Sequence, residues 1–502
     1  MQYCDVSTAM ETLHNLQSKL AAYNHAMGVL SLDASTAAPK GTSEGRGRTM
    51  AVLSEVTYGI IADPENEPLL SFLEEHLQEL NPQEKREVEL WRKSFNEISR
   101  IPAKEYIEYT VLINDAQDIW PQAKQENNFA LFAPYLEKII EFNRKFAGYY
   151  HPEMKTYDAL LNEYEEGLTT EMLDGFFAML RKELVPLINK IKEAKAPEDC
   201  FLHKYYPVDK QREFSDYLME VLGLDRNHCG IAETEHPYTT NFNCYDVRIT
   251  THYQEHDLAS SMYSVIHEGG HAIYELGCDP KYNYTMLSGG VSMGIHESQS
   301  RFFENIIGRS EPFIRSIFPK MQELFPEQLQ GVDAHMFWKA VNKAGSSLIR
   351  TEADELTYCM HIMVRYEIEK RLIDGSLAVK DLPQAWNEMY QQYLGIEVPD
   401  DQNGCLQDCH WSGGSIGYFP SYALGSAYGP QMLAFMEKDL GDIWQDVERG
   451  DLSRIKGWLG EHFHRHAGFY KPGVLFEMSC GKFDPTYYTN YLKEKYEALY
   501  NL

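Results

Sequence analysis

The sequence predicts a mostly α-helical protein. Amphipathic segments, with apolar residues three and four positions apart, run through most of the 502 residues. Strand-like character appears mainly once, at residues 244–251, which alternate and are rich in β-branched side chains. No repeat, low-complexity tract or Ser/Gly-rich linker interrupts the chain. We therefore expect one long helical assembly, although length alone would allow about three domains.

The N-terminal part of the chain is predicted as successive helices. Residues 5–27 form one helix that ends near Gly28, and residues 33–48 look irregular. Helical periodicity resumes at 47–62 and again at 67–80. These segments are the first elements of the helical assembly.

The next helix has a strong start signal. In Asn81-Pro-Gln-Glu84, Asn is a favoured N-cap, Pro suits the first turn, and Glu at the third position completes a capping box. Amphipathic segments continue to about residue 148, and residues 155–195 keep the same pattern. Prolines are predicted to cut the earlier segments into pieces, at Pro102, Pro121 and Pro134.

The second half combines the strand with further helices. Residues 244–251 are predicted as an edge strand able to hydrogen-bond an extended peptide, and an ordinary small hairpin is the alternative. Helical runs follow at 292–308, 334–372 and 430–502. Between the last two, residues 404–425 are rich in Gly and Pro yet contain Trp, Tyr and His, so they are predicted to form a buried or functional loop.

The chain is organised around the helix predicted at residues 262–277. His267 and His271 lie four residues apart, so their rings project side by side and can hold one divalent cation. Glu268 lies about 100° round the helix, within reach of a water at the metal but not of the metal itself. The alternative is that both histidines are ordinary hydrogen-bonded residues.

Two adjacent glycines in the same helix need an explanation. Gly269 and Gly270 each cost about 1 kcal/mol relative to Ala in mid-helix. Small residues there would let substrate or a neighbouring helix approach closely. Their presence favours a functional helix over a chance match.

A catalytic zinc site needs a third protein ligand and an open position for water. Glu297 begins a polar face on the next predicted helix and is our candidate, with Glu304 and Glu275 as alternatives. Glu268 would take the proton of the attacking water and return it to the leaving amine. Donors for the oxyanion are available in the glycine-rich segment, at Tyr418, Tyr422 and His410.

Composition excludes several classes of partner. Lys and Arg number 46 against 75 Asp and Glu, for a net charge of −29. Such a surface repels nucleic acid and anionic lipid, so we expect neither nucleic-acid nor membrane binding. A solvated acidic surface is enough to explain the charge.

Compartment signals point to the cytoplasm. No apolar run approaches the ~18 residues of a membrane span. The N-terminus lacks the basic head and apolar core of a signal peptide. The nine cysteines are odd in number and widely scattered, which favours reduced thiols over a disulfide framework.

Together these residues resemble the thermostable, Taq-type metallocarboxypeptidases, and the resemblance spans nearly the whole chain. It rests on spaced motifs in the right order: Asp246-Val-Arg-Ile-Thr250, His267-Glu-Gly-Gly-His271, His296-Glu-Ser-Gln299, Ile349-Arg-Thr-Glu-Ala-Asp354 and Gly404-Cys-Leu-Gln-Asp-Cys-His-Trp411. Such a set is far more specific than any single motif.

The resemblance implies a helical zincin fold of the neurolysin-like kind, with a deep substrate groove and a very small β-sheet. It implies a single domain over 1–502, built of two helical lobes that flank the groove, with a catalytic core at about 236–425. It also implies release of single C-terminal residues from peptides with broad specificity, and a homodimer.

The resemblance also settles the expected metal ligands. It implies one divalent ion per chain held by His267, His271 and Glu297, with Glu268 as general base and acid. Zinc is the first expectation, and cobalt also suits a site of two His and one Glu.

A carboxypeptidase must recognise a free carboxylate, which a guanidinium binds through two parallel hydrogen bonds. Arg350 is our candidate for this contact, and Arg248 on the predicted strand is the second choice. The alternative for either is a buried ion pair, for example with Asp354 or Asp246.

The sequence departs from the family pattern near the N-terminus. The usual Trp-Asp…Thr-x-Met-Pro segment is replaced by Leu32-Asp-Ala-Ser-Thr-Ala-Ala-Pro39. We expect the metal and base to be untouched. The packing of the N-terminal helices over the groove, and hence selection of substrate size, is where a difference would appear.

Two other functions are compatible with the same residues. One is an endo-acting zinc oligopeptidase of the same broad fold, which would not require a free C-terminus. The other is a non-catalytic helical peptide-binding protein that has kept the motif. Retention of every expected ligand and of the base counts against the second.

Overall fold

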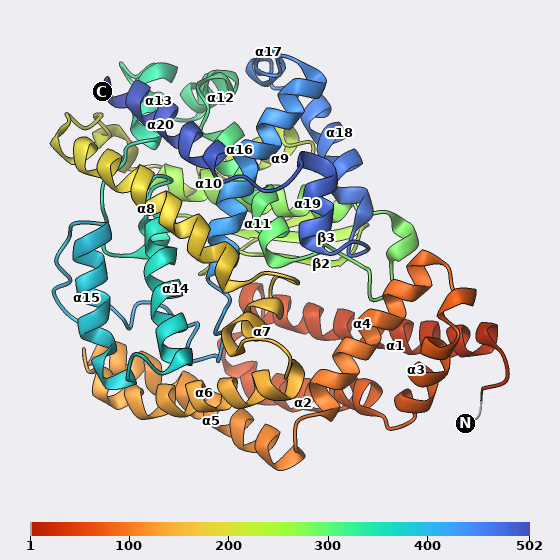
Figure 1. Cartoon of the computed structure of the whole chain (residues 1–502). Coiled ribbons are helices and arrows are strands. Elements are labelled where there is room, and N and C mark those ends of the chain that lie inside the picture. Colours follow the sequence, from red (N-terminus) through yellow and green to blue (C-terminus); the bar gives the residue numbers. More distant parts are fainter. Residues whose placement is uncertain (1–2) are drawn as a thin grey trace.

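Helices dominate the computed structural model, which describes residues 3–502 (Figure 1). The helices before the sheet are α1 (Val6–Thr36), α2 (Ser43–Ala62), α3 (Asn66–Glu75), α4 (Pro82–Ser99), α5 (Ala103–Gln125), α6 (Phe129–Tyr150), α7 (Thr156–Asn162), α8 (Thr170–Glu193) and α9 (Val208–Val221). The strands are β1 (Cys229–Glu233), β2 (Thr239–Asn243) and β3 (Asp246–Thr251). The helices after the sheet are α10 (Leu258–Leu276), α11 (Met293–Arg301), α12 (Glu311–Leu324), α13 (Ala334–Val341), α14 (Tyr358–Asp374), α15 (Leu382–Tyr393), α16 (Pro420–Leu440), α17 (Trp444–Glu448), α18 (Ser453–His462), α19 (Pro472–Cys480) and α20 (Thr486–Tyr500).

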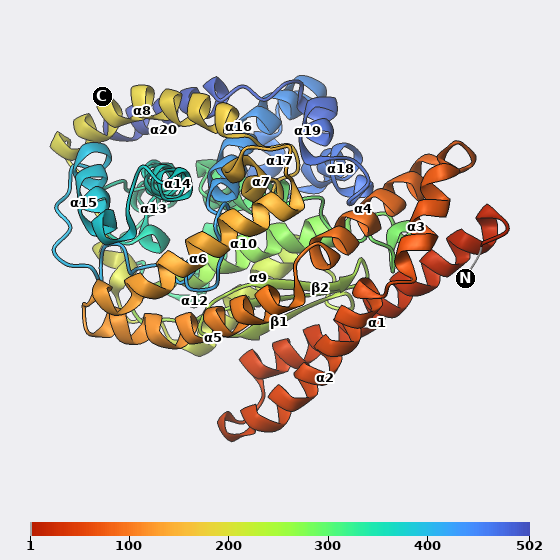
Figure 2. The ribbon, with the colours of Figure 1, turned by 60° about the horizontal axis from the view of Figure 1, so that its bottom comes forward.

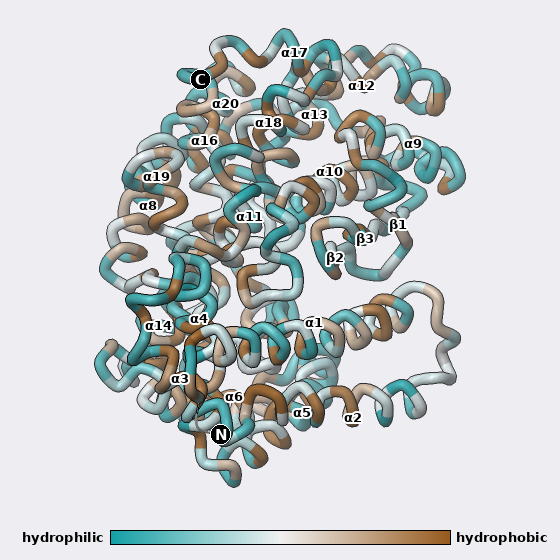
Figure 3. The backbone as a smooth tube through the Cα atoms, turned by 90° about the vertical axis from the view of Figure 1, so that its right-hand side faces the viewer, coloured by the Kyte–Doolittle hydropathy of each residue, from teal (hydrophilic) through white to brown (hydrophobic). Residues whose placement is uncertain are grey.

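The N-terminal helices form one side of the molecule. Helices α1 and α2 run side by side and project from it (Figures 2 and 3). Helix α1 does not end near Gly28, as predicted, but continues to Thr36. Gly28 packs under Phe242 of β2, and a Cβ there would lie 2.9 Å from the phenyl ring. This tertiary contact accounts for a glycine inside a helix, where it would otherwise be read as a stop.

Prolines shape the next helices less than predicted. The capping box at Asn81 and Glu84 forms as expected, and Pro102 is the N-cap of α5. Pro121 and Pro134, however, lie inside α5 and α6 and do not divide them, so that prediction was wrong. Apolar residues on both sides of each proline are buried, and this packing outweighs the lost backbone hydrogen bond.

The sheet has three strands in the order β1-β3-β2. Strand β3 pairs parallel with β1 and antiparallel with β2, so it is central and not the predicted edge strand. Strands β2 and β3 form the small hairpin that was the alternative. Strand β2 was missed because its sequence, Thr-Thr-Asn-Phe-Asn, is mostly polar.

The predicted helical runs of the second half are interrupted near the candidate site. Residues 292–308 form α11 and then a π-helical turn, Phe302–Gly308. The run predicted at 334–372 is broken between α13 and α14, and Arg350 lies in that break. Helix α16 starts at Pro420, because proline suits the first turn of a helix, so Tyr422 is helical and not part of a loop.

Helices α10, α11 and α16 form the centre of the molecule (Figure 1). Helix α10 packs on the sheet and on α11, and α11 packs on α16. The buried side chains of these helices belong to one continuous hydrophobic core. None of the helices within residues 3–502 is both long and apolar enough to cross a membrane.

Candidate metal centre

The structure brings His267, His271 and Glu297 together. The Nε2 atoms of the two histidines lie 3.8 and 3.6 Å from Oε2 of Glu297. The imidazole rings are 5.0 Å apart and nearly perpendicular. Among the residues described, these form the one cluster of His, Cys, Asp or Glu with metal-binding spacing.

The spacing of the donors fits a divalent cation. These separations are too long for direct hydrogen bonds. A tetrahedral ion about 2.1 Å from each donor would hold the donors about 3.4 Å apart. Two imidazole nitrogens and one carboxylate oxygen are also the donor set of a catalytic zinc site.

Two glycines hold α11 close to its neighbours. A Cβ at Gly270 would lie 2.7 Å from the Cα of Ser300, and a Cβ at Gly425 would lie 2.5 Å from the side chain of Glu297. Helix α11 therefore packs between α10 and α16 so closely that neither glycine position has room for a methyl group. The prediction that small residues in α10 admit a neighbouring helix is confirmed for Gly270.

We expect Gly270→Ala to weaken both the fold and the metal site. The added methyl group must push the α11 backbone away, at a cost of about 1–3 kcal/mol, and Glu297 moves with it. Thermal unfolding and competition with a chelator measure the two effects. Gly175→Ala is the matched control, because Gly175 lies in α8 with open space around it, and it should stabilise by about 0.5–1 kcal/mol. Unchanged metal affinity in Gly270→Ala would contradict the conclusion that close packing of α11 on α10 positions Glu297.

Charged groups surround the triad on the side away from the metal position. Arg301, one helical turn after Glu297, donates from Nε to Oε1 of that carboxylate at 2.8 Å. This leaves Oε2 facing the imidazoles. Glu304, in the π-helical turn, lies 2.8 Å from Nδ1 of His267. Burial alone would raise the pKa of Glu304. The opposite effect of Arg301, His267 and Arg309 is larger, so the pKa lies well below its ordinary value.

Glu268 is buried beside the triad and is held by strand β2. The hydroxyl of Thr239 lies 2.6 Å from Oε2 of Glu268 and 3.1 Å from its backbone carbonyl. Burial is the main reason that the pKa of Glu268 is raised above its ordinary value. A carboxylate with a raised pKa is better matched to proton transfer near neutral pH.

The predicted oxyanion donors form one aromatic cluster. The rings of Tyr418 and Tyr422 are 5.1 Å apart and perpendicular. His410 Nε2 lies 3.4 Å from the hydroxyl of Tyr422. Burial lowers the pKa of His410 to about 4, so His410 is neutral at pH 7. Burial also raises the pKa of both tyrosines, so their hydroxyl groups remain protonated donors.

Arg350 is buried at the edge of this cluster. Its Nε and one amino group donate to Oδ1 of Asp408 at 3.0 and 2.8 Å, and the other amino group donates to Tyr358 at 3.1 Å. Its ion-pair partner is thus Asp408 and not Asp354, which accepts bonds from backbone amides instead. Asp408 also pairs with the buried Arg365, so one carboxylate faces two guanidinium groups.

Tyr358 joins this arginine to the metal triad. Its hydroxyl accepts from Arg350, and the guanidinium of Arg301 lies 4.4 Å from the centre of its ring. Arg301 in turn holds Glu297. Only one aromatic residue therefore separates the candidate carboxylate-binding arginine from the arginine that contacts Glu297.

Arg248 lies on the far face of the sheet. Thr239 and Asn241 of β2 hydrogen-bond Glu268 and Glu275 of α10, so their face is turned to α10. Arg248 is opposite Thr240 in the register, and successive residues in a strand point to opposite faces. It pairs with Asp246, as the alternative proposed. This placement favours Arg350 over Arg248 for substrate recognition.

Several residues of the site were not predicted. Arg301 had a usable signal, because it lies four residues after Glu297 on the same helix. Thr239 and Asp408 give no signal of their role, since their contacts depend on strand pairing and on the path of a loop. Glu304 and Glu275, considered as metal ligands, both lie on the far side of the imidazoles from the Nε2 atoms.

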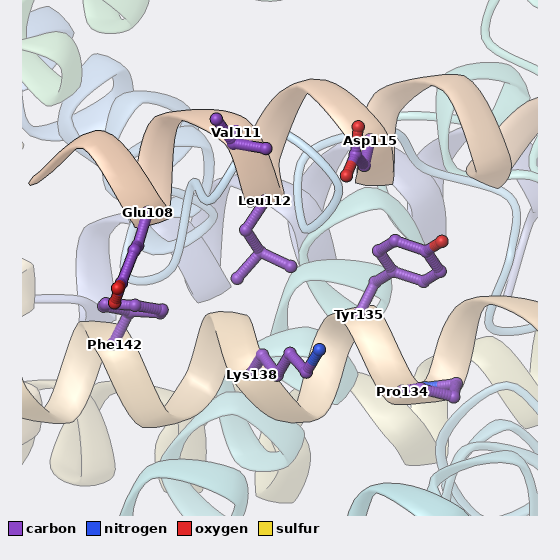
Figure 4. Close-up of a pocket in the computed structure, with 8 residues that line it drawn as sticks. All are labelled: Glu108, Val111, Leu112, Asp115, Pro134, Tyr135, Lys138 and Phe142. Carbon is purple, nitrogen blue, oxygen red and sulfur yellow. The ribbon is translucent and has the colours of Figure 1, made fainter. Parts of the chain in front are cut away.

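A separate surface cavity of about 540 Å³ lies between α5 and α6. Figure 4 shows Leu112 and Phe142 extending into the space between the two helices. None of the predicted site residues lines this cavity.

The fold and the His2Glu cluster with its adjacent glutamate are those of a metallopeptidase. The model of the "Carboxypeptidase Taq (M32) metallopeptidase" family matches residues 12–496. The chain belongs to this family and is a metallocarboxypeptidase, which requires a divalent metal.

Relatives match along nearly the full length. The chain is 40% identical to carboxypeptidase 1 of Bacillus subtilis, over 99% of this chain and all of the relative. It is 35% identical to thermostable carboxypeptidase 1 of Pyrococcus furiosus, over 97% of this chain and 98% of the relative. The crystal structure of the M32 carboxypeptidase from Deinococcus radiodurans superposes with a TM-score of 0.96 at 37% identity, covering 99% of this chain and all of that one.

Proposed function

We propose that the enzyme removes single residues from the C-terminus of peptides with broad specificity, and that His267, His271 and Glu297 hold the metal while Glu268 acts as general base and acid. The observation that carries the proposal is the convergence of both Nε2 atoms on one Glu297 oxygen, with the buried Glu268 alongside. When bound, a divalent cation lowers the pKa of water and polarises the scissile carbonyl.

Protein groups supply the remaining steps. Glu268 takes the proton of the attacking water and returns it to the leaving amine. Thr239 keeps the Glu268 carboxylate oriented, through the 2.6 Å contact. Tyr418, Tyr422 and His410 are the proposed donors to the developing oxyanion.

Arg350 is the proposed ligand of the substrate's C-terminal carboxylate. Each of its amino groups carries two N–H donors and uses one of them in the contacts above. Arg350 and Arg365 together carry two positive charges against the single carboxylate of Asp408. A further carboxylate, from the substrate, would balance the charge of this group. This combination favours an exopeptidase over the endo-acting alternative.

Amidation of the substrate's C-terminus tests this assignment. We expect a peptide amide to be cleaved at least about 100-fold more slowly than the free acid, because a charge-assisted contact with the guanidinium is lost. Product masses from matched acid and amide peptides measure the effect, with and without added Zn²⁺ or Co²⁺. Equal cleavage of the two, or cleavage within the amide peptide, would favour the oligopeptidase alternative.

We also propose zinc as the metal, a homodimer and a cytoplasmic location. The donor set supports zinc and also suits cobalt. The cysteines from Cys200 to Cys480 are free thiols, in keeping with a reducing compartment. The dimer follows from the family resemblance, and light scattering of the purified protein tests it.

A further inference from the structure

The two ligand imidazoles have different partners behind them. Nδ1 of His267 contacts a carboxylate directly, at Glu304. Nδ1 of His271 instead lies 2.6 Å from Nδ1 of a third histidine, His296. Nε2 of His296 then lies 2.6 Å from Oε1 of Glu275. Behind His271 there is thus a chain of two hydrogen bonds that ends on a buried carboxylate.

The proton positions along this series of hydrogen bonds are linked. A neutral imidazole has one N–H donor and one acceptor nitrogen. If His271 binds a metal through Nε2, its proton must be on Nδ1 and points to Nδ1 of His296. His296 must then accept at Nδ1 and carry its own proton on Nε2, which faces Glu275. Every atom in this arrangement has a suitable partner.

The opposite arrangement is disfavoured by Glu275. A proton on Nδ1 of His296 would place the proton of His271 on Nε2, the atom that faces Glu297, and would block the cation. It would also leave Nε2 of His296 facing a carboxylate oxygen with no proton between them. An ionised carboxylate only accepts hydrogen bonds. Glu275 thereby selects the arrangement that frees Nε2 of His271.

Surrounding contacts hold this chain in place. Glu275 also accepts from the amide of Gly290 at 2.9 Å and from Nδ2 of Asn241 at 2.6 Å. A Cβ at Gly290 would lie 2.5 Å from the His296 ring, so the loop before α11 closes directly over that ring. Tyr274 packs on the ring as well, at 5.1 Å.

We propose that His296 and Glu275 are positioning residues that fix His271 in its metal-binding tautomer. The proposal rests on the assignment of His271 as a ligand and goes beyond it, because His296 and Glu275 lie behind that ligand and are not proposed ligands themselves. It also gives the first residue of the His296-Glu-Ser-Gln299 motif a role distinct from that of Glu297. Substitution of residues in such positions typically weakens metal binding by about 10- to 100-fold.

The test is metal affinity in the full chain. Apo-protein is titrated with Zn²⁺ in competition with a chromophoric chelator. We expect His296→Phe, which keeps the ring but removes both nitrogens, to bind about 10- to 100-fold more weakly than wild type. His296→Gln, whose amide oxygen can accept from His271, should recover part of the loss. Wild-type affinity in His296→Phe would overturn the proposal.

A neighbouring histidine supplies the matched control. His464 is buried and packs on the same Tyr274 at 5.0 Å, but its Nε2 bonds Gln299 and not a metal ligand. His464→Phe should bind Zn²⁺ as tightly as wild type. An equal loss in His464→Phe would show a general packing effect and would also overturn the proposal.

A further measurement needs no variant and so does not depend on folding of His296→Phe. Nitrogen chemical shifts of ¹⁵N-histidine-labelled, Zn²⁺-loaded protein should show His296 protonated at Nε2 only. Protonation at Nδ1 would reject the proposal. The ligand assignment itself fails separately, if His271→Ala binds Zn²⁺ as tightly as wild type.

Discussion

Glu268→Gln should lower turnover by about 100- to 10,000-fold while the protein keeps its metal. The amide is nearly the same size as the carboxylate and can still contact Thr239, so the site should keep its shape. It cannot accept a proton from water, which is the function we assign to this residue. Steady-state kinetics on a free-acid peptide and metal analysis of the same sample measure the two properties. Near-full turnover in this variant would refute the mechanism.

Glu297→Gln is the matched comparison. It replaces a carboxylate with an amide, as Glu268→Gln does, but at a proposed metal ligand. We expect it to lose metal and activity together, whereas Glu268→Gln separates them. If both variants lost metal equally, the distinction between base and ligand would not hold.

Arg350→Lys should lower kcat/KM on free-acid peptides by about 10- to 100-fold with metal content unchanged. Lysine keeps the positive charge opposite Asp408 but loses the planar pair of donors that matches a carboxylate. Loss of one hydrogen bond to a charged group is worth about 1.5–3 kcal/mol. Kinetics on matched acid and amide peptides should show that the preference for the acid shrinks. A full preference in this variant would remove Arg350 from substrate recognition.

The choice of lysine also protects the fold. Arg350 is only 7% exposed, and its partner Asp408 is mostly shielded from solvent beside it. Removing the side chain, as in Arg350→Ala, would leave Asp408 paired with Arg365 alone and would open a cavity where the guanidinium packed. Arg248→Lys is the control, because Arg248 lies on the far face of the sheet, and it should leave the acid preference unchanged.

The sequence was sufficient for the fold class and for the pairing of His267 with His271. Helical periodicity is a local property, and the spacing of His267 and His271 on one helix fixes their relation without any tertiary information. Glu297 is different, because its approach depends on how α11 packs on α10. The residues alone left Glu304 and Glu275 open, and the family resemblance selected Glu297.

The remaining features depend on contacts between distant segments. Gly28 and Pro134 carry local signals for a break, yet packing keeps both inside helices. The position of β3 at the centre of the sheet follows from a parallel pairing with β1 that no short-range pattern encodes. Arg350 was predicted as a functional residue, but its partner Asp408 comes from a loop nearly sixty residues further on.

The tight contact between α10 and α11 has a consequence for the choice of ion. Both imidazoles come from α10 and the carboxylate comes from α11, so the distance between the two backbones sets the radius that the donors can enclose. A calcium ion needs oxygen ligands at about 2.3–2.6 Å and more of them, whereas zinc prefers about 2.0–2.2 Å. Widening the enclosure would separate Gly270 from Ser300 and open a void in the core. We therefore expect the glycine in the middle of the helix to disfavour large cations at the proposed metal site.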